Sequence, residues 1–98
     1  MNIDKKKTGN SLVISIEGKL NNSTAPQLEA ELQEGLDGIS NLTIDLADLV
    51  YVSSAGLRVL LLAQKKMNAK GKMVVKNVCD EIMEVFEDTG FSSILTIE

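Results

Sequence analysis

The chain lacks histidine and tryptophan, and Cys79 is the single cysteine in its 98 residues. Histidine is the commonest general base and metal ligand in proteins, so its absence disfavours a histidine-based triad or metal centre. One cysteine can form neither an internal disulfide nor a thiolate metal cluster. We therefore expect no enzyme activity, no cofactor and no metal, and we interpret Cys79 as an inert, partly buried thiol.

A long hydrophobic run and an excess of positive charge are also missing. The longest apolar run, Val59–Ala63, is far shorter than the about 20 residues of a membrane span. Residues Met1 to Lys5 show no apolar stretch of a signal peptide. The net charge of −4 is unsuited to nucleic acid, and Lys5–Lys7 is interpreted as a solvated strand end. We expect a cytoplasmic monomer that binds neither nucleic acid nor membrane.

The residues that are present predict one α/β domain over residues 1–98. Hydrophobic residues make up 44% of the chain and charged residues 24%, as in ordinary globular proteins. Apolar residues alternate in short runs and recur at helical spacing in the segments between them, which indicates βαβ units. We expect a mixed, mostly parallel central sheet of 4–5 strands with covering helices. The predicted strands are Ile3–Lys7, Ser11–Glu17, Leu42–Leu46, Met73–Lys76 and Ile94–Ile97, and the predicted helices are Ala25–Leu36, Ser54–Ala69 and Val78–Asp88.

Particular residues mark the helix boundaries. Thr24 and Gln27 have the spacing of a capping box at the start of the first helix. Gly71 suits the position just after the second helix, and Gly90 suits the stop of the third. Asn77 is expected to be the N-cap of the third helix.

The second helix carries apolar residues on more than its core face. At about 100° per residue, one stripe forms the natural core face, and the residues opposite include Arg58 and Leu61. Leu57 and Leu62 fall on the two flanks. Leu57, Leu61 and Leu62 therefore predict a small apolar partner site, unless another part of the domain covers them. The core stripe is Gly56, Val59, Leu60, Ala63 and Met67.

Two serines, Ser53 and Ser54, stand at the start of this helix. Only one of them can be the N-cap, so the pair leaves one hydroxyl over. Gly56 is costly inside a helix, which suggests that something approaches the backbone closely. An anion would be stabilised there by free N–H groups and the helix dipole, with Arg58 one turn along.

Three segments together resemble a known family. The run from Asp45 to Leu61, DLADLVYVSSAGLRVLL, is similar to the signature of STAS domains, in particular the bacterial anti-sigma factor antagonists. GKLNNSTAPQL, from Gly18 to Leu28, resembles the family's first-helix segment, and TGF around Gly90 resembles its last helix end. The order of the three segments extends the resemblance over almost the whole chain, which implies a STAS-like fold.

The resemblance implies a switch with Ser54 as its phosphorylated residue. In such proteins a partner anti-sigma factor, which is also a serine kinase, phosphorylates the serine before the small residue and glycine. Unphosphorylated antagonist binds the anti-sigma factor and frees the sigma factor. Phosphorylated antagonist is released, and a serine phosphatase of the metal-dependent type resets it. An accessory STAS subunit of a transporter or sensory complex, docked without phosphate, is the alternative.

The sequence departs from the family pattern at two positions. The family often has aspartate where this chain has Ser53 and Asn21, and Ser53 is the second choice as phosphate acceptor. We expect one contact face for the partner, formed by a polar loop, the two serines and one surface of the second helix. Its residues are Asn21, Asn22, Ser23, Thr24, Ser53, Ser54, Gly56, Leu57, Arg58, Leu61 and Leu62.

Overall fold

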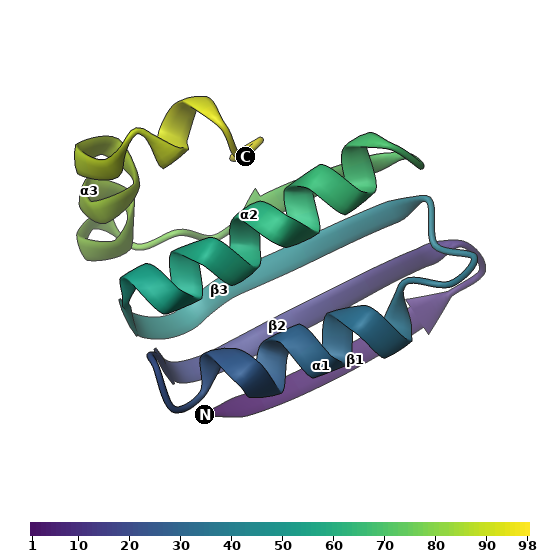
Figure 1. Cartoon of the computed structure of the whole chain (residues 1–98), viewed down its shortest axis with the longest axis horizontal. Coiled ribbons are helices and arrows are strands. Elements are labelled where there is room, and N and C mark those ends of the chain that lie inside the picture. The colour runs from purple at the N-terminus through teal and green to yellow at the C-terminus, as the bar shows by residue number, and fades with distance from the viewer.

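A four-stranded sheet with helices on it forms the computed structural model, which describes all residues 1–98 (Figure 1). The strand order is β1-β2-β3-β4; β1 pairs antiparallel with β2, and the other two pairings are parallel. The expectation of an α/β domain with a mixed, mostly parallel sheet is confirmed. The strands are β1 Asn2–Thr8, β2 Ser11–Leu20, β3 Asn41–Val52 and β4 Lys72–Lys76.

The three predicted helices are present, with ends within two residues of the predicted ones. They are α1 Ala25–Gly35, α2 Ser54–Asn68 and α3 Asp80–Thr89, and a short 3-10 helix, Phe91–Ser93, follows α3. Figure 1 shows α1 and α2 side by side on the same face of the sheet, with α3 near one end of α2. No helix combines the length and the apolar character needed to cross a membrane.

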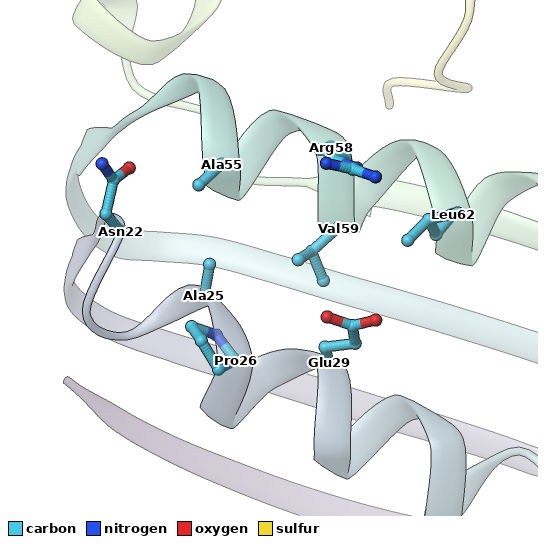
Figure 2. A pocket seen from close by; sticks show the side chains of 8 residues that line it. All are labelled: Asn22, Ala25, Pro26, Glu29, Ala55, Arg58, Val59 and Leu62. Carbon is cyan, nitrogen blue, oxygen red and sulfur yellow. The ribbon is translucent and has the colours of Figure 1, made fainter.

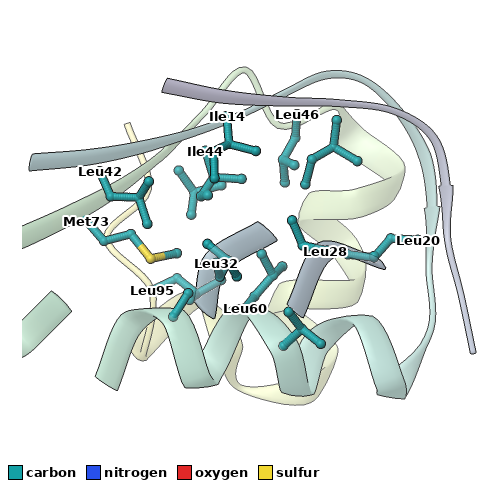
Figure 3. Packing of buried hydrophobic residues seen from close by; sticks show 14 of the residues in the cluster. Ile14, Leu20, Leu28, Leu32, Leu42, Ile44, Leu46, Leu60, Met73 and Leu95 are labelled. Atoms are coloured by element: carbon teal, nitrogen blue, oxygen red, sulfur yellow. The ribbon is translucent and has the colours of Figure 1, made fainter. Parts of the chain in front are cut away.

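The core lies between the sheet and this helical layer. Along β2 to Ile16 and along β3 to Leu46 every second side chain is buried, which is the alternation that the sequence predicts. Beyond Leu46 the buried residues of β3 are Leu49 and Val52, three positions apart. Leucine, isoleucine and methionine fill most of the space, as Figure 3 shows for Ile14, Leu28, Ile44, Leu60 and Met73. The predicted core stripe of α2 is buried throughout.

Strand β3 extends far beyond its partner β4. The β4 strand pairs only with Asn41 to Asp45, whereas the pairing of β2 with β3 continues to Leu20 opposite Val52. The carboxyl ends of β2 and β3 therefore lie together. Because α1 follows β2 and α2 follows β3, both helices begin at the same end of the sheet.

Two predictions about helix ends are wrong. Asn77 has a positive φ of 58° and does not cap α3, where Cys79 is the N-cap residue. Helix α2 ends at Ala69 in a right-handed conformation, so Gly71 is not a left-handed stop. Gly71 is instead required by close packing, because a Cβ there would lie 1.9 Å from the Ser40 carbonyl oxygen.

Two further expectations fail near the chain's loops. Thr24 is the N-cap residue of α1 but makes no side-chain cap hydrogen bond, since its hydroxyl is used inside the preceding loop. The predicted strand Ile94–Ile97 is reduced to one parallel bridge between Ile97 and Val75. Gly90, by contrast, ends α3 with φ 81° in the left-handed region, as predicted.

Candidate functional site

The two serines lie beside the loop that links β2 to α1. The backbone N–H of Ser53 donates to the Leu20 carbonyl at 2.8 Å, and the Ser53 hydroxyl donates to Asn22 Oδ1 at 3.3 Å. The polar loop and the start of α2 are therefore held together.

Ser53 and Ser54 have different environments although they are neighbours. Ser53 is the N-cap of α2, and its Oγ accepts a hydrogen bond from the Gly56 N–H at 3.3 Å. Ser54 is the first residue of the helix and is exposed. Its hydroxyl is not part of any hydrogen bond in the structure. The prediction that one serine caps and the other is left over is confirmed.

Gly56 has a different role from the one expected. A Cβ at Gly56 would lie 2.6 Å from Leu20 Cγ and 3.0 Å from the Leu20 carbonyl oxygen. The group that approaches the backbone is therefore the end of β2, and an anion is not needed to explain the glycine. The close approach draws α2 against the loop that carries Asn21 and Asn22.

The loop Asn21–Thr24 is closed by its own hydrogen bonds. Asn21 Oδ1 accepts from the N–H groups of Ser23 at 2.9 Å and Thr24 at 3.1 Å. The Thr24 hydroxyl accepts from the Asn21 N–H and donates to the Lys19 carbonyl, both at 2.8 Å. These contacts fix the loop before α1 begins, and they leave Asn22 and Ser23 exposed next to Ser54.

The apolar patch on α2 is smaller than predicted. Leu57 is only 5% exposed and belongs to the core. Leu61 is partly buried, and Leu62 is 39% exposed on the opposite flank. Cover by another part of the domain, the alternative considered for the patch, is therefore correct for Leu57.

An open cavity of about 570 Å³ surrounds Ser54 on the α3 side. It includes four residues that the sequence analysis did not select: Tyr51 and Val52 at the end of β3, and Val85 and Thr89 on α3. Tyr51 is 48% exposed, and an exposed aromatic residue two positions before the serines was the available signal. The other lining residues are Asn21, Asn22, Ser23, Ser53, Ser54 and Leu57.

A second cavity, of about 340 Å³, lies between α1 and α2 (Figure 2). Figure 2 shows Ala25 and Ala55 on facing sides of it and Arg58 and Glu29 at its mouth. Asn22 lines this cavity as well as the one around Ser54. The remaining lining residues are Pro26, Val59 and Leu62. Of the predicted contact residues, Gly56, Thr24 and Leu61 line neither cavity.

The two helices beside this cavity carry opposite charge. Helix α1 contains three glutamates and no basic residue, whereas α2 contains one arginine, two lysines and no acidic residue. The only ion pair from either helix joins Glu31 to Lys5 of β1, and its hydrogen bond raises the pKa of Lys5. The start of α2 is therefore free of nearby negative charge on its own helix.

Charges elsewhere do not form a metal site. No group of three or more histidine, cysteine, aspartate or glutamate side chains is placed to hold a metal ion. On α3, the Glu81 carboxylate forms a hydrogen bond with the Glu81 backbone N–H and a second one with the Cys79 side chain. Both lower the pKa of Glu81. Cys79 itself is partly buried, with Sγ 3.8 Å from the Leu49 carbonyl oxygen.

Comparison with known proteins agrees with this fold. The family model described as "Mlab, STAS domain" matches residues 3–96, and the chain belongs to the STAS domain family. BtrV of Bordetella bronchiseptica, a candidate anti-sigma factor antagonist, is 38% identical over 99 residues, covering 99% of this chain and 85% of BtrV. The anti-sigma-B factor antagonist of Bacillus subtilis is 28% identical over 98 residues, covering 99% and 90%.

A solved structure shows the same fold. An anti-sigma factor antagonist from Mycobacterium paratuberculosis superposes with a TM-score of 0.88 at 22% identity, covering 98% of this chain and 83% of that one. The resemblance inferred from the three sequence segments is confirmed at the level of family and fold.

Proposed function

We propose that this protein is an anti-sigma factor antagonist controlled by phosphorylation of Ser54. Unphosphorylated, it binds an anti-sigma factor that is also a serine kinase, and it acts in the cytoplasm as a binding protein. Phosphorylation of Ser54 releases it, and a metal-dependent serine phosphatase restores it. The observation that carries the proposal is the exposed, unbonded hydroxyl of Ser54 at the start of α2, in a chain whose relatives include an anti-sigma-B factor antagonist.

Ser54 is favoured over Ser53 because the two hydroxyls are not equally available. The Ser53 hydroxyl caps α2 and also donates to Asn22 Oδ1, so its modification would remove the proton of that second bond and disturb the cap. Ser54 can be modified without loss of a hydrogen bond. The geometry therefore supports the same choice as the family motif.

The two departures from the family pattern preserve contacts that aspartate could also make. Ser53 caps α2 through an oxygen acceptor, and the bonds to the Ser23 and Thr24 amides use the side-chain oxygen of Asn21. An aspartate carboxylate would accept the same bonds. Serine and asparagine thus keep the local geometry while removing negative charge near Ser54, which eases the addition of a phosphate.

A phosphate on Ser54 need not unfold the protein. It adds about −1.5 to −2 charges and three acceptor oxygens, and an anion is favourable at a helix N-terminus. Arg58, one helical turn further on, faces the same side and forms no ion pair in the structure. Release would come from bulk and charge at the contact face, and a loss of about 3 kcal/mol would weaken binding roughly a hundredfold.

The test compares three variants of the full chain in its native cells. The partner captured by the parent is identified by mass spectrometry, and its affinity is measured for Ser54→Ala, Ser54→Asp and the matched control Ser92→Asp, which changes an exposed serine on the 3-10 helix. We expect Ser54→Ala and Ser92→Asp to bind like the parent and Ser54→Asp to bind about a hundredfold more weakly. Phosphate should be found on the Ser54 peptide.

Equal binding by Ser54→Ala and Ser54→Asp, with no phosphate on that peptide, would contradict the switch. That result would favour the alternative of an accessory STAS subunit docked permanently to a transporter or sensory complex. Capture of a partner with neither kinase nor anti-sigma activity would lead to the same conclusion.

A further inference from the structure

The cavity between α1 and α2 continues along both helices as a groove. A second hollow of about 210 Å³ adjoins it and shares Glu29, Val59 and Leu62 with it. Together they extend along α2 from Ala55 to Lys66, a length of about 16 Å at 1.5 Å per residue. We call this feature the α1–α2 groove. Its further lining residues are Leu32, Gln33, Ala63 and Lys66.

Small side chains keep the groove open. Ala25 and Ala55 stand on facing sides at one end (Figure 2), and Ala63 lines the other end. Leucine or isoleucine at these positions would close the space between two packed helices. Leu62, 39% exposed, adds an apolar surface that lies in both halves of the groove.

The two sides of the groove, which we call the α1 bank and the α2 bank after the helices that form them, carry opposite and largely unpaired charge. On the α1 bank Glu29 has no ionic partner, and on the α2 bank neither Arg58 nor Lys66 has one, because the ion pairs of the protein are Lys5–Glu31 and Lys76–Glu98. All the charged residues of α1 are acidic and all those of α2 are basic. An occupant would therefore need basic residues on one edge and acidic residues on the other.

The α1–α2 groove combines a length of about three helical turns, apolar lining residues and opposite charge on its two banks. From these features we infer that it is a docking site for an amphipathic helix of a partner protein. About three turns of that helix fit the groove, with apolar side chains one turn apart against Val59 and Leu62. Its acidic edge faces Arg58 and Lys66, and its basic edge faces Glu29.

The groove is connected to Ser54 at its Ala55 end. Asn22 lines both the groove and the cavity around Ser54, and Arg58 lies four residues after Ser54 on one helix face. A phosphate on Ser54 competes for Arg58 with the acidic edge of the docked helix. We assign the docked helix to the anti-sigma factor, and this assignment rests on the proposed function. The inference that the groove is a docking site does not depend on it.

Synthetic peptides test the groove without the cellular partner. Three helical peptides of about 14 residues share one leucine stripe and differ at their edges: glutamate on one edge and lysine on the other, lysine on both, or glutamate on both. Binding to the full chain is followed by amide chemical shifts and by titration. We expect the mixed peptide to bind most tightly and to shift amides between Ala25 and Gln33 and between Ala55 and Lys66.

Charge reversal of one bank supplies the decisive comparison. Arg58→Glu with Lys66→Glu makes both banks acidic, so the mixed peptide should bind about tenfold more weakly and the all-lysine peptide should become the preferred one. The matched control, Lys6→Glu with Lys72→Glu, changes the net charge equally at exposed positions outside the groove and should leave the ranking of the peptides unaltered.

Three results would overturn the inference: no binding of any peptide, equal binding of all three, or shifts outside the groove. Concentration-dependent shifts in the groove without peptide would also overturn it, because the occupant would then be a second copy of this chain. Since the peptides require neither kinase nor phosphate, failure here leaves the Ser54 test intact, and failure of that test leaves this one intact.

Discussion

Helices α1 and α2 begin side by side at the same end of the sheet, yet their first turns use polar groups differently. Before α1, Asn21 and Thr24 satisfy each other and the neighbouring backbone, and Pro26 has no N–H to satisfy. Before α2, Ser53 provides the cap and Ser54 adds a hydroxyl with no partner. The polar side chains before α1 bond to one another and to the nearby backbone, whereas the start of α2 leaves one hydroxyl exposed and unbonded.

This difference places a hydroxyl that stabilises the helix and one that makes no hydrogen bond within a single turn of α2. Capping requires one side-chain acceptor, and a second hydroxyl next to it contributes little to folding. The charged residues of the two helices differ in a similar way. In α1, Glu31 forms an ion pair with Lys5 of β1, whereas the basic residues of α2 form no ion pair. Four substitutions test whether this difference holds.

The largest effect is expected from the glycine of α2. Gly56→Ala forces a Cβ against Leu20, so the unfolding free energy should fall by about 2 kcal/mol, the overpacking cost exceeding the gain in helix propensity. Gly35→Ala in α1 is the matched control, because its Cβ would lie 3.6 Å from Leu12 Cδ2, an ordinary contact. Urea unfolding of both variants measures the contrast; equal stability would mean that α2 is not seated tightly on β2.

The loop before α1 should give the next largest loss. Asn21→Ala removes the acceptor of two backbone N–H groups, and we expect a loss of about 1.5 kcal/mol in unfolding free energy. Asn22→Ala is the control, since its side chain makes only the 3.3 Å contact with Ser53, and it should cost less than about 0.5 kcal/mol. A larger loss for Asn22→Ala would show that the link between the loops stabilises the fold.

Adjacent serines should differ in the same measurement. Ser53→Ala removes the cap of α2 and should cost about 1 kcal/mol. Ser54→Ala should stay within about 0.5 kcal/mol of the parent, because no hydrogen bond is lost. Thermal and urea unfolding of the two variants provide the readout, and a reversed order would assign the cap to Ser54.

The smallest effect concerns the Lys5–Glu31 ion pair that ties α1 to β1. Because this contact raises the pKa of Lys5 above its ordinary value of 10.5, its stabilisation is present below that value and is lost as the pH rises through the folded-state pKa. The stability difference between the parent and Glu31→Gln should therefore shrink at alkaline pH. Glu29→Gln, whose parent residue has no ion pair, should show no such dependence, and a constant difference for Glu31→Gln would contradict the assignment.

Local patterns in the sequence predicted most of the fold. Alternation at Leu12, Ile14 and Ile16 fixed the buried face of β2, and helical spacing fixed the core stripe of α2, because each pattern depends on one element alone. The length of β3 beyond Leu46 and the reduction of the last strand to a bridge at Ile97 depend on pairing with distant strands. Such pairings leave no signal within the segment itself.

The site was predicted in part for the same reason. Ser53 and Ser54 lie at the N-terminus of one helix, so their positions could be recognised from the sequence of that helix alone. The burial of Leu57 in the core depends on elements other than α2, and the role of Gly56 depends on Leu20. The groove was missed because Ala25 and Glu29 become relevant only when α1 lies beside α2.

Strand β3 continues past Asp45 with β2 as its only neighbour, so the sheet narrows to a two-stranded ribbon before the chain enters α2. Ser53 and Ser54 stand at the tip of that ribbon. Opening motions there involve fewer strand contacts than motions in the four-stranded body. The position of the two serines is therefore set by β2 and the loop that follows it, through the bond of the Ser53 N–H to the Leu20 carbonyl, and the edge strands β1 and β4 have no part in it.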